Sequence, residues 1–144
     1  MACGNLREGG QSADHCARVA QLAVDLVAAA NATPVCPAKP HLGSINMRAG
    51  LHAGPLVATV LGSSQPKFTL FGDTVNTASR MESNSAKNRV TLSGAAAGLL
   101  RLQAPHLAHR LVPRGPVAIK GKGEMELFFF EPEGSPHLLP KKEA

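Results

Sequence analysis

The stretch Phe68-Thr-Leu-Phe-Gly-Asp-Thr-Val-Asn-Thr-Ala-Ser-Arg-Met-Glu-Ser83 decides the fold of this chain. Its first four residues are a short apolar run typical of a strand, and Gly72-Asp73 interrupts that run. Asp73 is a candidate N-cap for a helix that begins at Thr74. Three apolar residues at three-residue steps predict the buried stripe of this helix: Val75, Ala78 and Met81. The stretch therefore predicts a strand, a turn and an amphipathic helix.

Asn76 and Arg80 lie four positions apart, which puts them together on a different face of the predicted helix. An amide beside a guanidinium can bind an anion, because both groups donate hydrogen bonds and the guanidinium keeps its charge. The spacing alone favours a solvated helix face over an anion site. The rest of the chain has to decide between these two interpretations.

The segment before this stretch alternates between the two faces of a predicted strand. One face carries Met47, Ala49, Leu51 and Ala53, and the other carries Arg48 and His52. A lone histidine on a strand favours a structural role for His52. Gly54-Pro55 ends the strand, and Leu56 to Leu61 predicts a second, more apolar strand. Because the two strands are close in sequence, we expect them to be antiparallel neighbours.

The N-terminal part predicts a packing helix from a cap at Ser12 to about Ala30. Its expected buried stripe consists of Val19, Leu22, Ala23, Leu26 and Ala30, opposite a polar face of Asp14, Arg18, Gln21 and Asp25. Residues 31–44 contain three prolines and a glycine and predict a surface loop.

The C-terminal part predicts a strand at 89–92 and a short helix from a cap at Ser93 to about Arg101. A strand at 109–112, a turn at 113–116 and a terminal hairpin of 117–120 with 124–130 follow. Together these elements predict an α+β fold, with an antiparallel-rich sheet and helices packed on one face.

Length, charge and cysteine usage narrow the class of protein. The 144 residues allow one domain, and a net charge of +5 without a basic stripe or stacking aromatics disfavours a nucleic-acid binder. Three unevenly spaced cysteines fit neither a zinc site nor a disulfide framework, so we expect reduced thiols. No apolar run approaches the length of a membrane span. We expect a cytoplasmic domain, on its own or as the cytoplasmic part of a membrane protein.

The stretch 68–83 closely resembles the signature of class III nucleotidyl cyclases, in particular the guanylyl cyclase catalytic domain. Residues 47–62, from Met-Arg-Ala-Gly to Val-Leu-Gly, resemble the strand pair before that signature. Residues 117–125, Val-Ala-Ile-Lys-Gly-Lys-Gly-Glu-Met, resemble the family's lysine loop. The three blocks follow the family's order and cover nearly the whole chain. The resemblance implies a ferredoxin-like core in a partial catalytic domain at 1–131, followed by a tail at 132–144 that we expect to be disordered.

The resemblance also implies an activity and a set of residues for it. Class III cyclases are phosphorus–oxygen lyases of intracellular signalling, which convert a nucleoside triphosphate to its 3′,5′-cyclic monophosphate and pyrophosphate. Two subunits share each active site. By resemblance, Asn76 and Arg80 are catalytic, holding the ribose and stabilising charge on the α-phosphate. Lys120 binds the terminal phosphates, and Thr69 occupies the base-reading position.

Thr69 leaves the choice of base open. Guanylyl cyclases usually have cysteine at this position and many adenylyl cyclases have aspartate. A hydroxyl can donate to guanine O6 or accept from the adenine amino group. The rest of the signature, Phe-Gly-Asp-Thr-Val-Asn, resembles guanylyl cyclases and favours GTP, with ATP as the alternative.

The resemblance is incomplete at the front of the chain. Cyclases hold Mg²⁺ or Mn²⁺ with two aspartates that lie upstream of the strand that Met1–Leu6 resembles. Asp14 and Asp25 are too far apart on one helix to replace them, and Asp73 belongs to the signature turn. We therefore expect no metal ligands in this chain, an unprotected sheet edge, and negligible activity without a metal-bearing partner. The alternative is a non-catalytic regulatory or dimerisation module that pairs, as a homodimer or heterodimer, with a cyclase.

Overall fold

The computed structural model describes residues 1–6 and 13–135. The predicted cap at Ser12 and all but the first four residues of the predicted tail lie outside the described residues. Residues 1–6 form no helix or strand, although they resemble a strand of the family. No helix in the described ranges is long and apolar enough to cross a membrane.

A four-stranded sheet forms the body of the protein, with strand order β1-β4-β6-β5. Its strands are β1 (Ala49–Leu51), β4 (Val90–Ser93), β5 (Leu111–Ile119) and β6 (Gly123–Phe130). β1 runs parallel to β4, and the other neighbours are antiparallel. The expected α+β class with an antiparallel-rich sheet is confirmed. β1 lies at an edge of this sheet, with β4 as its neighbour.

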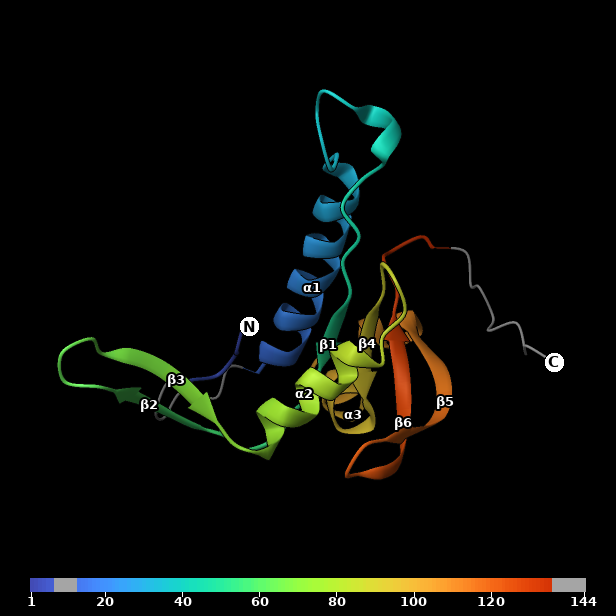
Figure 1. Cartoon of the computed structure of the whole chain (residues 1–144). Helices are drawn as coiled ribbons and strands as arrows, with labels where there is room; N and C mark the ends of the chain where they lie inside the picture. The colour runs from blue at the N-terminus through green and yellow to red at the C-terminus, as the bar shows by residue number, and fades with distance from the viewer. Residues whose placement is uncertain (7–12, 136–144) are drawn as a thin grey trace.

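A separate two-stranded sheet is formed by β2 (Val57–Leu61) and β3 (Lys67–Phe71), and Figure 1 shows it projecting from the body. We call this sheet the arm. The expectation that the strands at 47–53 and 56–61 are neighbours is therefore wrong. β2 pairs antiparallel with β3, which returns after the short 62–66 loop, whereas β1 pairs with the distant β4.

Helices cover both faces of the four-stranded sheet: α1 (His15–Ala32) and α3 (Gly94–Gln103) lie on one face and α2 (Asp73–Ser83) on the other. The main core joins α1 and α3 to Leu92 and Phe130, whereas Met81 of α2 packs against Leu127. Residues 127 and 130 of β6 point to opposite faces, because successive side chains alternate along a strand. The expectation of helices on one face is thus corrected.

The buried stripe of α1 also differs from the predicted one. Leu22 and Leu26 are 43% and 45% exposed. The buried residues are Cys16, Ala17, Ala20, Ala23, Val24 and Val27, so of the predicted stripe only Ala23 is buried. Small side chains on this face let α1 approach α3 closely, since the distance between packed helices depends on the side chains at the contact.

β5 is one continuous strand, so the predicted turn at 113–116 is wrong. A shift in the pairing register between Pro113 and Gly115 takes the place of that turn. Prolines are tolerated here because β5 is an edge strand, where a missing N–H need not break a ladder. Residues 109 and 110 belong to the 3₁₀ helix η2 (Pro105–Arg110) instead of a strand. The 31–44 loop contains a second 3₁₀ turn, η1 (Pro40–Leu42).

Several local predictions are confirmed. Ser93 caps α3, and its Oγ accepts a hydrogen bond from the Ala96 amide. β5 and β6 form the predicted terminal hairpin across residues 120–122. Met47, Ala49 and Ala53 pack against the main core, as their alternation predicts.

Candidate functional site

The turn into α2 differs by one residue from the predicted one. Gly72 is the N-cap, and Asp73 is the first helical residue, without a side-chain capping bond. The φ angle of Gly72 is 135°, in the region that favours glycine. A carboxylate in the first helical turn is still favourable, because the N-terminus of a helix carries partial positive charge.

The buried face of α2 is formed by Thr74, Thr77 and Met81, whereas Val75 and Ala78 are half-buried. The prediction from apolar spacing is therefore confirmed for Met81 and wrong for Val75 and Ala78. Threonine can be buried here because each hydroxyl finds a backbone acceptor. Thr74 Oγ1 donates to the Pro55 carbonyl at 2.5 Å, and Thr77 Oγ1 donates to the Asp73 carbonyl at 2.8 Å.

Asn76 and Arg80 lie outside this buried face. Asn76 is exposed and Arg80 is half-buried. Within the described part of the chain, neither side chain has a hydrogen-bond or ion-pair partner. An amide and a guanidinium with unused donors are thus available to a ligand on this side of α2.

Thr69 lies in the middle of β3, opposite Thr59 of β2. It is half-buried, and its hydroxyl lies 3.4 Å from the Lys67 carbonyl oxygen, a long hydrogen bond that leaves it able to contact a ligand. Because β3 leads into α2 through Gly72, the candidate base-reading residue and the two candidate catalytic residues belong to one continuous strand–turn–helix unit.

Lys120 lies in the loop between β5 and β6, which we call the lysine loop (residues 120–122). It is exposed and has no ion-pair partner among the described residues. Gly121 and Gly123 have φ angles of 74° and 73°, which glycine adopts without strain. The neighbouring Lys122 forms an ion pair with Asp73 at the start of α2. This contact brings the lysine loop to the helix that carries Asn76 and Arg80.

Sequence reasoning missed the Asp73–Lys122 pair. The two residues are 49 positions apart, and no local pattern links them. The hydrogen bond from Lys122 holds the pKa of the Asp73 carboxyl below its ordinary value. Asp73 therefore stays ionised to lower pH than an ordinary aspartate does and keeps its partner there.

His52 lies close to this pair but is engaged elsewhere. Its Nδ1 is 2.7 Å from the Ser93 Oγ, which also caps α3. Burial lowers the pKa of His52, while the charge of Asp73 acts in the opposite direction. These contacts support the structural role expected for this histidine.

The described residues do not fit a metal ion. No group of three or more His, Cys, Asp or Glu side chains in residues 1–6 and 13–135 could hold one. Asp73 is paired with Lys122, and Asp25 on α1 accepts a hydrogen bond from Gln21 at 2.8 Å. No step of the proposed reaction is therefore assigned to a metal on this chain.

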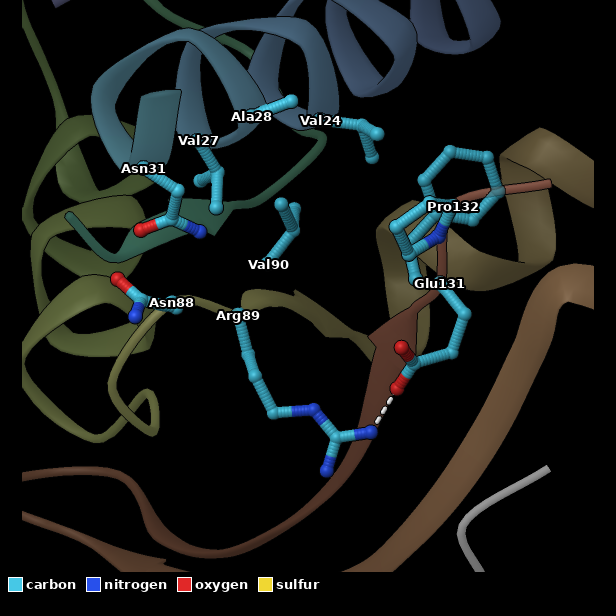
Figure 2. A pocket seen from close by; sticks show the side chains of 10 residues that line it. Val24, Val27, Ala28, Asn31, Asn88, Arg89, Val90, Glu131 and Pro132 are labelled. Atoms are coloured by element: carbon cyan, nitrogen blue, oxygen red, sulfur yellow. Dashed lines mark hydrogen bonds and ion pairs between the residues drawn. The ribbon is translucent and has the colours of Figure 1, made fainter. Parts of the chain in front are cut away.

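Two hollows on the surface are too small to enclose a nucleotide. Figure 2 shows one of about 150 Å³, where Val24 and Val27 of α1 face Val90, beside the Arg89–Glu131 ion pair. The other, of about 230 Å³, is lined by Asn46, Met47, Arg48 and Lys87. Ligand pockets usually measure about 300–1,000 Å³. Neither hollow includes a candidate site residue; the candidate residues lie on α2, β3 and the lysine loop.

Known proteins are similar to this chain in both sequence and fold. The adenylate and guanylate cyclase catalytic domain family matches residues 1–132. The human guanylate cyclase soluble subunit beta-2 is 40% identical over 117 residues, which is 81% of this chain and 18% of that protein. The guanylate cyclase domain of RhGC from Catenaria anguillulae, solved with GTP, has a TM-score of 0.72 and 32% identity, and the match covers 89% of this chain and 64% of that one.

A third likeness concerns assembly. The non-canonical dimeric guanylyl cyclase domain of the RhoGC fusion protein from Blastocladiella emersonii has a TM-score of 0.62 and 32% identity, covering 81% of this chain and 58% of that one. The chain spans only 8% to 18% of the length of the curated relatives that it matches.

Proposed function

The chain belongs to the catalytic-domain family of adenylate and guanylate cyclases, and from this premise we propose that it supplies the nucleotide-binding half of a cyclase active site. The reaction would be attack of the ribose 3′-hydroxyl on the α-phosphorus of a nucleoside triphosphate. The new bond from O3′ to the α-phosphorus closes the cyclic nucleotide, the bond from the α-phosphorus to the bridging oxygen breaks, pyrophosphate leaves, and the hydroxyl proton passes to water. One observation carries the proposal: Asn76 and Arg80 share a side of α2 outside its buried face, and neither side chain has a partner among residues 1–6 and 13–135.

Arg80 would stabilise the charge that develops on the α-phosphate. The guanidinium suits this task because it is always charged and its planar fork matches phosphate oxygens. Asn76, one helical turn earlier, would bind the ribose and orient the attacking hydroxyl. Phosphoryl chemistry depends chiefly on positioning and electrostatic stabilisation, which these two groups can supply.

Lys120 would bind the terminal phosphates and stabilise the leaving pyrophosphate. Its exposure and the glycine beside it leave its ammonium group accessible to a ligand. Thr69 would contact the base. We propose GTP as the preferred substrate, because the relative solved in complex with GTP and the human relative are both named as guanylate cyclases. ATP remains the alternative that a hydroxyl at this position accommodates.

We further propose that the site is completed by a second cyclase domain, of the same or another chain, that brings the metal ions. The arm supports this part of the proposal. Its exposed large apolar side chains are 46% to 63% exposed: Val57, Val60, Leu61, Phe68 and Phe71. An isolated two-stranded sheet is marginally stable in water, so a partner that covers these side chains would stabilise the arm.

The test mixes the purified chain with a metal-bearing cyclase domain whose own nucleotide half has been inactivated, with Mg²⁺ and GTP or ATP. We expect cyclic nucleotide from the mixture and negligible product from the chain alone. Arg80→Ala in the chain should remove the product, because charge on the α-phosphate is then unopposed; loss of such a group typically costs about 10²–10³-fold in rate.

The matched control is Arg101→Ala, on α3 and outside the site, which should leave the rate unchanged. Undiminished product with Arg80→Ala would refute the assigned role. If the chain instead raised the rate of a cyclase domain with complete sites of its own, and did so equally with Arg80 or with Arg80→Ala, the chain would act as a regulatory or dimerisation module, which is the alternative function.

A further inference from the structure

We propose that Asp73 and Lys122 form a clamp that holds the lysine loop along α2, so that Lys120 faces the same ligand as Asn76 and Arg80. Both members of the clamp would be positioning residues for the phosphates. This inference rests on the proposed function and adds two residues to it.

The position of Asp73 on the helix is the first observation. Asp73, Asn76 and Arg80 are spaced i, i+3 and i+7, so they follow one stripe of α2. The clamp therefore lies at the N-terminal end of the stripe that carries the candidate catalytic pair. Because Lys122 contacts Asp73, the lysine loop is held at that stripe.

The second observation concerns the two strands that flank the lysine loop. Ile119 and Leu127, on the two strands that flank the loop, are buried against Met81 near the other end of α2. Met81 and Asp73 are separated by about 12 Å along the helix, at 1.5 Å per residue. The hairpin therefore follows α2 from Met81 to Asp73, past the positions of Asn76 and Arg80. Lys120 lies in the part of the chain between these two anchoring contacts.

Within the described residues, the clamp is the ion pair that ties the tip of the loop to the body. A Cβ added at Gly121 or Gly123 would meet nothing within 4 Å, so the loop backbone lies in open space. Lys122 forms one ion pair in the described part of the chain, the pair with Asp73. A backbone hydrogen bond from the Lys122 N–H to the Ile119 carbonyl at 2.9 Å closes the turn itself, so without the clamp the tip of the hairpin would move relative to α2, and the entropy of ordering it there would oppose phosphate binding.

If Asp73 and Lys122 acted only through their charges and did not position the loop, one of their variants would have the opposite effect on GTP binding. The Asp73 carboxylate lies on the ligand stripe and would repel a triphosphate if Lys122 did not neutralise it. If charge alone mattered, Asp73→Asn would strengthen GTP binding and Lys122→Gln would weaken it. If the clamp positions the loop, both variants weaken GTP binding.

The experiment measures the affinity of the full chain for GTP and for GMP in the wild type, Asp73→Asn, Lys122→Gln, and the exchanged pair Asp73→Lys with Lys122→Asp. We expect each single variant to weaken GTP binding by about 1.4- to fivefold, the range of an exposed ion pair. The exchanged pair should recover most of the loss. GMP affinity should be unchanged throughout, because GMP lacks the phosphates that Lys120 would contact.

A second measurement does not depend on the nucleotide. Backbone ¹⁵N relaxation of Gly121 and Gly123 should show greater picosecond-to-nanosecond mobility in both single variants and wild-type mobility in Lys120→Gln. Tighter GTP binding by Asp73→Asn, or unchanged loop mobility in both single variants, would overturn the clamp. If GTP does not bind the wild type, or Lys120→Gln leaves its affinity unchanged, the proposed function fails while the mobility measurement still decides whether the clamp exists.

Discussion

Arg80 and Arg110 show how differently one residue type is used in this protein. Arg80 is half-buried without an intramolecular partner in the described ranges, whereas Arg110 is 4% exposed and lies over the Phe130 ring. Arg110 Nε donates to the Glu131 carbonyl at 2.7 Å, and its Nη1 donates to Gln21 at 2.8 Å. Arg80 is therefore available to bind a ligand, whereas Arg110 stabilises the fold.

This contrast predicts that two alanine substitutions change the free energy of unfolding by very different amounts. Arg80→Ala should change the free energy of unfolding by less than about 0.5 kcal/mol, as for most surface substitutions. Arg110→Ala should lower it by on the order of 3 kcal/mol, because it removes two hydrogen bonds of a buried charged group. Urea denaturation followed by circular dichroism measures both values. A comparable loss in Arg80→Ala would mean that Arg80 is a structural residue.

The Asp73–Lys122 pair predicts a specific titration. The hydrogen bond from Lys122 lowers the pKa of Asp73 in the folded state, so the contribution of the pair is present above the ordinary carboxyl pKa. It is lost as the pH falls through the lower, folded-state value. In Lys122→Gln the pKa of Asp73 should rise towards its ordinary value, which a carboxyl-detected NMR titration measures. Lys120→Gln is the control and should leave the Asp73 pKa close to that of the wild type; equal titration curves in all three proteins would contradict the pair.

At the scale of the elements, the contact between β1 and α2 depends on the absence of a side chain. A Cβ at Gly50 would lie 2.0 Å from the Glu82 amide nitrogen and 2.5 Å from the Met81 carbonyl carbon. These are backbone atoms of α2, which cannot rotate away as a side chain can. The close approach of β1 brings Arg48 to Glu82, where the two side chains form an ion pair at 2.6 Å.

Two glycine variants test this packing as a matched pair. Gly50→Ala should destabilise the protein by about 3 kcal/mol or more, because α2 must move away from the sheet. Gly98→Ala, within α3 and with nothing within 4 Å of the added Cβ, should stabilise it by about 0.5–1 kcal/mol. Thermal melting compares the two. A wild-type melting temperature in Gly50→Ala would show that α2 and β1 are less closely packed than the structure describes.

At the scale of the whole molecule, the body and the arm differ in what stabilises them. The body has two apolar clusters on the two faces of its sheet. The arm is a pair of strands with large apolar side chains exposed on both of its faces, since Val57 and Val60 of β2 point in opposite directions. A surface of this kind is expected to be covered in an assembly.

The arm predicts the effect of a polar substitution on assembly. Phe68→Ser should weaken self-association, or association with another cyclase domain, while the melting temperature of the body stays within a few degrees, because Phe68 is 62% exposed. Sedimentation velocity over a concentration series measures the association. Leu102→Ser, at an 81% exposed leucine on α3, is the control and should leave association unchanged. Equal effects of the two variants would exclude the arm as the interface.

Several local signals in the sequence predicted local elements correctly, although the turn at 113–116 and the cap at Asp73 were wrong. The helix after Gly72, the Ser93 cap and the terminal hairpin were confirmed because each depends on residues a few positions apart. The phase of the buried stripes was less predictable. Thr74 and Thr77 replace Val75 and Ala78 on the buried face, since a hydroxyl that reaches a backbone carbonyl can be buried as readily as a methyl group.

By itself, the sequence determined the α+β class, the family resemblance and the placing of Asn76 and Arg80 on one side of a helix. These follow from backbone periodicity and from motifs that lie within a short stretch. Only the tertiary structure decided that β1 pairs with β4, that the arm stands apart, that helices cover both faces, and that Lys122 meets Asp73. The β1–β4 pairing joins Ala49 to Val90 and the ion pair joins residues 49 positions apart, and both depend on how elements pack together, which no local spacing encodes.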